Sequence, residues 1–268
     1  AQLALEQYAL LLLDLNLPDS RGLETLYKVH DLYPDLPVIV LTGLEDESLA
    51  YEAMDKGAEN FFFKTEITAH TNMLLRYIYS SVKRAKERIN AQSLVDTLST
   101  FNAKQDIYTA IHQKRVAELA IEIARKLKLS RDERNIVRTG ALLHDNGKNS
   151  IPGTILSKPG KLNDIEHMYI VKHPEEGADN LKDSRLDPRI IQAIIEHHER
   201  LDGSGYPFGL KAGQISRPGR IIAVADVAEA IISHRPYREA FAPEVAYKYL
   251  LENKGKLFDS KIAETCVE

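Results

Sequence analysis

The apolar residues of this 268-residue chain follow two different patterns, and the change between them falls near residue 70. Before that point, three short apolar runs at residues 8–13, 37–41 and 61–63 alternate with helix-like segments. Short, continuous apolar runs are typical of strands buried on both faces, and strands that alternate with helices form parallel sheets. From Phe101 onwards, the pattern is almost entirely helical. We therefore expect a small α/β unit followed by an all-helical unit.

Composition excludes several classes of protein. The single cysteine, Cys266, rules out an internal disulfide and a cysteine-rich zinc module, and a reducing, cytoplasmic setting is expected. No apolar run approaches the roughly 18 to 20 residues that span a bilayer, and no signal peptide is recognisable, so we expect no membrane association. The dense basic and aromatic patches of proteins that bind large nucleic acids are missing as well.

Charge is distributed unevenly along the chain. Residues 1–70 contain 4 Lys and Arg against 13 Asp and Glu, a net charge of −9, whereas the remainder contains 31 against 26, a net charge of +5. A basic cleft in the second part would attract a substrate that carries phosphate groups. Ordinary variation of surface charge explains the difference equally well.

Three chemically different side chains follow the three predicted strands of the first unit. Asp14, Thr42 and Lys64 each stand at the carboxyl end of an apolar run. Ligands of parallel sheets gather at the carboxyl ends of the strands, so we expect these three side chains to converge. A carboxylate, a hydroxyl and an ammonium group together could accept and sense a phosphoryl group.

The segments that contain these residues resemble a response-regulator receiver domain, with a flavodoxin-like parallel sheet. The resemblance implies that Asp14 is phosphorylated by a cognate sensor histidine kinase, that Thr42 signals the change and that Lys64 contacts the phosphoryl group. The first strand of the family and its acidic pair, which bind the Mg²⁺ needed for phosphorylation, are not recognisable, so the receiver looks partial. Either they lie upstream or this receiver cannot bind the metal; an inert α/β dimerisation domain is the alternative. The matching segments are residues 14–19 (DLNLPD), 41–43 (LTG) and 63–64 (FK).

A long helix is predicted between the two units. Residues 72–98 contain no proline or glycine, and apolar residues recur there every three to five positions, which is typical of an amphipathic helix. Such a helix could transmit a signal, form a homodimer as a coiled coil or act as a rigid spacer. The resulting domain limits are 1–70 for the receiver, 71–100 for the linker helix and 101–268 for the helical domain. A homodimer could form through the receiver or through the linker helix.

Histidines and aspartates lie in or beside the apolar faces of the predicted helices in the second unit, one of which covers about residues 111–127. An ionised carboxylate in apolar surroundings is costly unless it is paired or binds a metal, and histidine is a common metal ligand. One of these histidines, His173, is followed by a proline, and we expect residues 173–174 (HP) to open a new segment. The candidate ligands number seven, which is too many for one tetrahedral ion. Seven ligands suit two ions that share a bridging group, as in enzymes that catalyse in-line phosphoryl displacement. They are His112, His144, Asp145, His173, His197, His198 and Asp226.

A polar segment directly follows the histidine pair. Two glycines and several turn-forming residues predict a loop over residues 199–207, at the rim of the site. Its Tyr206 could stack on a base or hydrogen-bond a phosphate, or could simply pack the loop. Arg235 and Arg238 follow the helix of Asp226, and guanidinium groups near a metal site suit phosphate recognition, although surface solvation would also explain them.

These motifs together resemble the HD-GYP phosphodiesterases, a helical branch of the HD superfamily. The family opens cyclic di-GMP to linear pGpG and often continues to GMP. The resemblance implies that the seven side chains are metal ligands, that Lys148 binds phosphate or helps to protonate the leaving oxygen beside Asp145, and that Gly205, Tyr206, Arg235 and Arg238 hold the substrate. The matching segments are residues 144–145 (HD), 147–148 (GK), 173–174 (HP), 197–199 (HHE), 205–207 (GYP) and the helix of Asp226.

Two positions depart from the family. Asn146 replaces an apolar residue beside the ligand pair and could alter the packing that supports it. Some members have a glutamate one turn before the first ligand histidine and use it for a third metal, but this chain has Tyr108 there. We therefore expect two divalent ions, with iron or manganese best suited and nickel, cobalt or zinc possible.

Three alternatives to a cyclic di-GMP phosphodiesterase stay open. A catalytically weak sensor or adaptor would bind a cyclic dinucleotide without turnover, but would not need seven metal ligands. A phosphohydrolase of nucleotides is disfavoured by the loop at residues 205–207. Cyclic GMP-AMP is an alternative substrate, because nothing in the motifs reads the base. Regulation is expected through phosphorylation of Asp14, which would shift the helix at residues 72–98.

Overall fold

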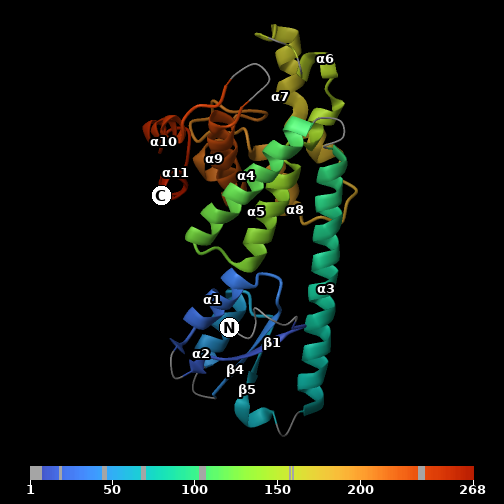
Figure 1. Cartoon of the computed structure of the whole chain (residues 1–268), viewed down its shortest axis with the longest axis vertical. Coiled ribbons are helices and arrows are strands. Elements are labelled where there is room, and N and C mark those ends of the chain that lie inside the picture. Colours follow the sequence, from blue (N-terminus) through green and yellow to red (C-terminus); the bar gives the residue numbers. More distant parts are fainter. Residues whose placement is uncertain are drawn as a thin grey trace. The chain divides into compact units, whose positions relative to one another are not determined.

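The computed structural model describes residues 8–17, 20–43, 47–67, 71–102, 107–156, 158, 160–234 and 239–268. The chain divides into two compact units (Figure 1). The first unit comprises Ala1–Leu94 with Leu129–Asp132, and the second comprises Val95–Lys128 with Glu133–Glu268. The domain limits that we derived from the sequence stay predictions.

The first unit contains the expected parallel sheet. Its three strands, β1 (Leu11–Asp14), β4 (Val38–Thr42) and β5 (Asn60–Phe63), run in the order β1-β4-β5, and both pairs are parallel. The middle strand is almost completely buried, which explains its continuous apolar sequence. Two strands of two residues, β2 (Asn16–Leu17) and β3 (Ser20–Arg21), form a separate antiparallel pair.

Helices α1 (Glu24–Leu32) and α2 (Glu47–Asp55) and the short 3-10 helix η3 (Lys64–Glu66) complete this unit. Leu26 of α1 and Ala53 of α2 are fully buried in one cluster with Leu13, Val38 and Val40 of the sheet. This apolar cluster fixes the strands, so that the residues at their carboxyl ends are presented along one edge.

The long helix predicted after residue 71 is confirmed as α3 (Thr71–Asn102), a single helix of 32 residues. Within the first unit, Arg84 Nε lies 3.4 Å from Glu59 Oε2, and Arg88 pairs with the other oxygen of the same carboxylate. The ring of Tyr77 meets the ring of Phe62 edge-on at 5.7 Å. Because Glu59 and Phe62 lie just before and within β5, these contacts attach α3 to that strand.

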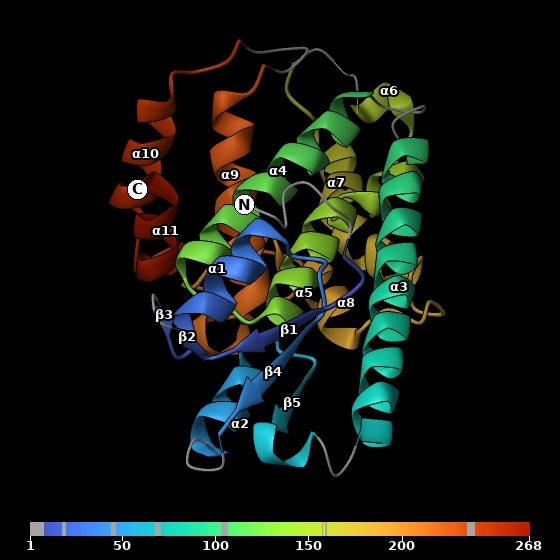
Figure 2. The ribbon, with the colours of Figure 1, turned by 60° about the horizontal axis from the view of Figure 1, so that its bottom comes forward.

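The second unit is helical, as expected, and Figure 2 shows α9 between α10 and α4. Helix α9 packs against α4, α8, α10 and α11, and α7 packs against α8 and η4. Helix α9 is buried along most of its length, including Ile221, Ile222, Val224 and Ala225. This burial explains why the sequence is apolar there. The helices are α4 (Ile107–Lys126), α5 (Arg131–Leu143), η4 (Asn146–Ser150), α6 (Gly153–Leu156), α7 (Asp164–Asp179), α8 (Pro188–Glu196), η5 (Ala212–Gln214), α9 (Arg217–Ile232), α10 (Pro243–Glu252) and α11 (Ser260–Val267).

Helices α8 and α9 begin at recognisable capping residues. The Asp187 side chain accepts the Arg189 N–H at the start of α8, and the Ser216 side chain accepts the Gly219 N–H at the start of α9. Both helices also have proline in the first turn. Within the described ranges, none of the helices combines the length and apolar character that a membrane crossing requires.

One expectation about chain organisation is wrong. His173 and Pro174 do not open a segment but lie inside α7. Proline has no N–H to give to the carbonyl four residues earlier, which is that of Ile170. The His173 side chain replaces the missing donor, because its Nδ1 lies 2.6 Å from that carbonyl oxygen. The helix therefore continues through the proline.

Candidate metal centre

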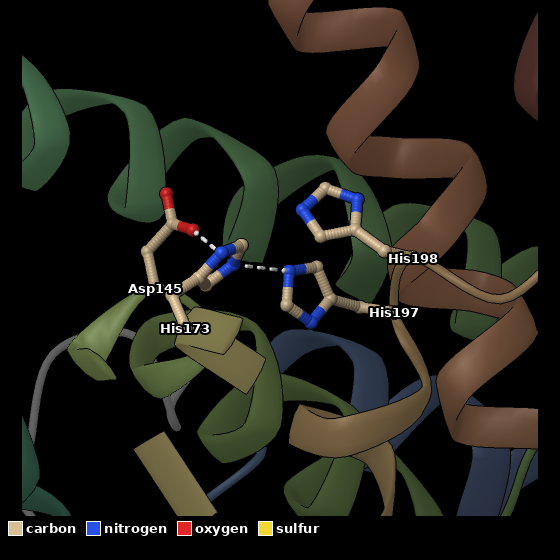
Figure 3. Close-up of side chains that lie close together, drawn as sticks. All are labelled: Asp145, His173, His197 and His198. Atoms are coloured by element: carbon tan, nitrogen blue, oxygen red, sulfur yellow. Dashed lines mark hydrogen bonds and ion pairs between the residues drawn. The ribbon is translucent and has the colours of Figure 1, made fainter. Parts of the chain in front are cut away.

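Five elements of the second unit bring the seven predicted ligands together. His144 and Asp145 directly follow α5, and His197 and His198 directly follow α8, so four of the seven lie where a helix ends. His112 comes from α4, His173 from α7 and Asp226 from α9. Figure 3 shows how Asp145, His173, His197 and His198 point toward one another. The side chains form two groups that could each hold a metal ion: Asp145, His173, His197 and His198; and His112, His144 and Asp145.

Asp145 belongs to both groups, and its two oxygens face different histidines. Oδ2 lies 3.4 Å from His144 Nε2 and 3.8 Å from His112 Nε2. Oδ1 lies 3.3 Å from His173 Nε2. This carboxylate is therefore placed to bridge two ions.

Asp226 has a similar intermediate position. Its Oδ1 lies 3.0 Å from His112 Nε2 and 3.9 Å from His144 Nε2. Its Oδ2 faces His198, whose Nδ1 is 3.9 Å away. Both aspartates are buried, so their charges need cationic partners.

The ring orientation of three histidines is set by the main chain. Nδ1 of His144, His173 and His197 lies 2.7, 2.6 and 2.6 Å, respectively, from the carbonyl oxygen three residues earlier. A carbonyl can only accept, so Nδ1 carries the proton in each neutral ring. Each Nε2 is then an unprotonated acceptor that points into the cluster.

This arrangement brings lone pairs into opposition. His173 Nε2 and His197 Nε2 are 3.2 Å apart (Figure 3), and two unprotonated nitrogens cannot form a hydrogen bond with each other. Among the described residues, His144 Nε2 and Asp145 Oδ1 are buried without a hydrogen-bond partner. Cations within the cluster would satisfy all four atoms, so the donor set fits metal ions.

Burial and neighbouring charges keep the centre in a ligating state. Burial holds the pKa of His197 and His198 well below its usual range, so both rings are neutral. For Asp145, burial favours the protonated form, but the positive charge of Lys148 opposes it, and the pKa lies well below the ordinary value. His112 behaves differently in the metal-free chain: burial opposes its charge, yet its hydrogen bonds to the carboxylates of Asp226 and Glu229 raise its pKa to about 9.

Lys148 lies beside the cluster, on η4. Its Nζ is 2.7 Å from Asp145 Oδ2, and its side chain remains 21% exposed, so the ammonium group can also reach a ligand from solvent. Gly147 allows η4 to approach α7, because a Cβ at that position would lie 1.9 Å from the His173 carbonyl oxygen. Asn146 begins η4, where its Oδ1 accepts a hydrogen bond from Asn149 at 3.3 Å.

The loop after the histidine pair reaches the rim of the cluster. The ring of Tyr206 lies 4.7 Å from the ring of His198, with an angle of 32° between their planes. Burial raises the pKa of Tyr206, so its hydroxyl remains a donor. Gly205 has no room for a side chain, since a Cβ would lie 2.4 Å from Arg200 N.

Glu199 has a role that the sequence did not reveal. Its buried carboxylate accepts the main-chain N–H groups of Phe208 at 2.7 Å and Leu210 at 2.9 Å. It thereby holds the loop that carries Tyr206. An acidic residue directly between a histidine pair and a loop was the available signal.

Glu229 was also missed, although it interrupts an apolar helix just as Asp226 does. It lies one turn after Asp226, and its Oε2 is 2.5 Å from His112 Nδ1. Arg235 and Arg238 lie outside the described residues. Tyr108 is in α4, four residues before His112.

The predicted phosphorylation site is assembled at one edge of the first unit's sheet. Asp14 Oδ2 lies 2.6 Å from Lys64 Nζ, and the Asp14 side chain is 32% exposed. The hydrogen bond from Lys64 lowers the pKa of Asp14. Thr42 is buried at the end of the neighbouring strand, where its hydroxyl lies 3.4 Å from the Gly43 carbonyl oxygen.

Comparison with known proteins assigns both units to known families. Residues 88–262 match the family model of the HD domain, and residues 1–74 match that of the response regulator receiver domain. The cyclic di-GMP phosphodiesterase response regulator RpfG of Xanthomonas campestris is 35% identical over 95% of this chain and 74% of its own length. A 3'3'-cGAMP-specific phosphodiesterase of Vibrio cholerae is 33% identical over 77% of this chain and 41% of its own length.

A solved structure supports the fold. Bd1817, an HDG"Y"P protein from Bdellovibrio bacteriovorus, superposes with a TM-score of 0.51 over 81% of this chain and 69% of its own, at 19% identity. The resemblance inferred from the sequence is thus confirmed at the level of family and fold. This chain belongs to the HD-GYP family of HD-domain proteins, with a response-regulator receiver domain at its N-terminal end.

Proposed function

We propose that this chain is a metal-dependent phosphodiesterase that hydrolyses cyclic di-GMP to linear pGpG, to GMP or to both. The observation that carries the proposal is the convergence of unprotonated histidine nitrogens on two buried aspartates. The similarity to RpfG, which is named as a cyclic di-GMP phosphodiesterase, supplies the substrate.

Two divalent ions would be held by the seven side chains, with Asp145 shared between them. Imidazole and carboxylate ligands suit iron or manganese, while nickel, cobalt and zinc are compatible with the same donors. When bound, such a pair of ions activates water at neutral pH and stabilises the negative charge on the phosphoryl oxygens during in-line displacement. The fit is supported by the buried atoms of His144 and Asp145 that no described residue satisfies.

The remaining roles fall to groups at the rim. Lys148 places its side-chain nitrogen beside the cluster, where it can pair with a phosphate or assist protonation of the leaving oxygen. Tyr206 offers a protonated hydroxyl and an aromatic face next to His198, which suits a phosphate or a base. Arg235 and Arg238 are proposed to bind the substrate phosphates, on the basis of the family motif alone.

The experiment is hydrolysis of cyclic di-GMP by anaerobically purified protein loaded with iron(II) or manganese(II). We expect turnover that is lost in His144→Ala. Tight binding without turnover, in protein that holds two metal ions, would reject the enzyme in favour of a sensor or adaptor. Cyclic GMP-AMP should be tested in parallel, because the relative from Vibrio cholerae is named for that substrate. A larger kcat/KM for cyclic GMP-AMP would correct the substrate without affecting the reaction type.

We further propose that a sensor kinase phosphorylates Asp14, with Mg²⁺ bound to a complete receiver, and that the change reaches α3 through β5. Lys64, which pairs with Asp14, directly follows β5, and Glu59, which holds Arg84 and Arg88 of α3, directly precedes it. The test compares turnover before and after phosphorylation, with Asp14→Asn as the control. Identical turnover in the two states would contradict the proposal. Formation of a homodimer through the receiver or α3 stays a prediction.

A further inference from the structure

His112 differs from three other histidines of the cluster in the partner of its Nδ1. In His144, His173 and His197, Nδ1 bonds a carbonyl oxygen of the main chain. His112 Nδ1 instead lies 2.5 Å from Glu229 Oε2. Among these four histidines, only His112 thus has a charged carboxylate in the place of a neutral carbonyl.

The reason lies in the position of His112 along its helix. At the other three histidines, the carbonyl three residues earlier is not used by the hydrogen bonds of the helix. His144 and His197 stand where a helix ends, and His173 precedes Pro174, which has no N–H. His112 lies within the continuous helix α4, so the equivalent carbonyl is occupied by the helix itself. The ring can therefore be oriented only by a side chain from another helix, and α9, which packs on α4, provides Glu229.

Glu229 is itself firmly held. The Ser233 hydroxyl donates to its Oε1, and Arg115 NH1 lies 3.7 Å from the same oxygen and 3.0 Å from the Ser233 oxygen. The carboxylate is buried, with His112 at one oxygen and Ser233 at the other. It is therefore an anion with its two oxygens committed to different donors.

We propose that Glu229 is a positioning residue of the metal centre. It fixes the proton of His112 on Nδ1, turns Nε2 toward Asp145 and Asp226, and strengthens the imidazole as a ligand through its negative charge. The proposal rests on the two-metal centre of the proposed function. It extends that centre to a residue that contacts neither metal nor substrate.

The geometry gives this role a specific consequence. His112 belongs to the group with His144 and Asp145, and not to the group that contains His173, His197 and His198. Loss of Glu229 should therefore weaken the binding of one ion and leave the other unchanged. Removing the carboxylate partner of a ligand histidine typically lowers metal affinity about 10- to 100-fold.

The experiment measures metal stoichiometry and affinity in the full chain for Glu229→Ala and Glu229→Gln. Each protein is titrated with manganese(II) or cobalt(II) and analysed for bound metal after dialysis against a weak chelator. We expect two ions in the unmodified chain, and one retained ion with a second weakened about 10- to 100-fold in Glu229→Ala. Glutamine keeps a hydrogen-bond acceptor without the charge, so Glu229→Gln should be intermediate.

Glu122→Gln is the matched control, since this glutamate lies on α4 like His112 but is 59% exposed and pairs with Arg125 instead. It should bind both ions as the unmodified chain does. Two ions bound with unchanged affinity in both Glu229 variants would overturn the proposal. An equal loss of affinity for both ions would also overturn it, because it would indicate a general structural role. Should Glu229→Ala fail to fold, Glu229→Gln alone decides between these outcomes. An unmodified chain that binds fewer than two ions would refute the two-metal centre instead, so the two failures are distinguishable.

Discussion

Replacing Glu199 with glutamine tests how the loop that carries Tyr206 is held against the metal centre. The carboxylate accepts two main-chain N–H groups, from Phe208 and Leu210. Glutamine has nearly the same shape but only one acceptor oxygen. Its amide nitrogen would therefore face one of the two N–H groups, donor against donor.

The magnitude follows from these two bonds. A hydrogen bond to a charged group contributes about 1.5–3 kcal/mol, and a buried N–H left without a partner costs about 1–3 kcal/mol. Allowing for local rearrangement, we expect the closed loop to lose about 2–4 kcal/mol relative to its open form. Since about 1.4 kcal/mol corresponds to a factor of ten, opening should become roughly 30- to 1,000-fold more frequent.

Amide hydrogen exchange measures this opening directly. The amides of Phe208 and Leu210 should exchange faster in Glu199→Gln by the same factor, while the amides of α8 keep their protection. Metal content should stay unchanged, because Glu199 is not among the clustered ligand groups. The KM for the cyclic dinucleotide should rise, since Tyr206 is no longer held in place.

Glu196→Gln provides the matched control. Glu196 lies one turn earlier and is equally buried, but its carboxylate accepts from Ser216 N and the Gln192 side chain rather than from the loop. Unchanged exchange at Phe208 and Leu210 in Glu199→Gln would refute the reasoning. The same increase in both variants would show that the loop responds to general destabilisation and not to its own anchor.

Three further predictions concern packing, protonation and thiol chemistry. Gly147→Ala places a Cβ 1.9 Å from the His173 carbonyl oxygen, so it should destabilise the second unit by at least about 3 kcal/mol and lower its Tm by roughly 10 °C. Gly153→Ala, with no atom within 4 Å of the new Cβ, should leave Tm nearly unchanged, and equal melting of the two variants would contradict the packing argument. The pKa of His112 is about 9 in the metal-free chain, so the ring must lose a proton to bind a metal. Metal binding at pH 7.5 should release that proton. Metal affinity should weaken as the pH falls from about 9. By the same shift, the contribution of His112 to the stability of the metal-free chain is complete below about pH 6.5 and is lost as the pH rises through about 9. Calorimetric titration with metal in buffers of different ionisation enthalpy measures the proton release. A binding heat that does not depend on the buffer would contradict the proton release. Burial raises the pKa of Cys266 from 9.0 to about 11, so alkylation at pH 8 should be about 100-fold slower in the folded chain than in urea, and equal rates would disprove the shift.

The elements that could be predicted from the sequence are those whose pattern of apolar and polar residues depends directly on their burial. A strand such as β4, covered on both faces, must be continuously apolar, so it could be recognised without knowledge of its neighbours. Strands β2 and β3 have two residues each, too few for any periodicity, and were missed. The ligand set was recognisable because charged or polar groups such as Asp226 interrupt apolar helices, where they need a reason to be buried.

The relations between ligands could not be predicted in the same way. That Asp145 turns one oxygen to His173 and the other to His144 depends on how α5, α7 and η4 pack. The pairing of Glu229 with His112 joins residues 117 positions apart and exists only because α9 crosses α4. Pro174 was misjudged because proline usually breaks a helix, and the compensating donor is a side chain whose direction a sequence does not give.

The proline within α7 gives His173 a form of preorganisation that does not depend on any metal. A free imidazole in water exchanges its proton between two nitrogens, and a ligand ring must give up that freedom when an ion binds. Here the covalent structure of the neighbouring residue removes the main-chain competitor for the Ile170 carbonyl, so the His173 ring is already in its binding tautomer. The entropic cost of ordering this ligand is therefore met during folding rather than during metal uptake. An alanine at position 174 would return the carbonyl to the helix and leave the ring to choose its tautomer only when the ion arrives.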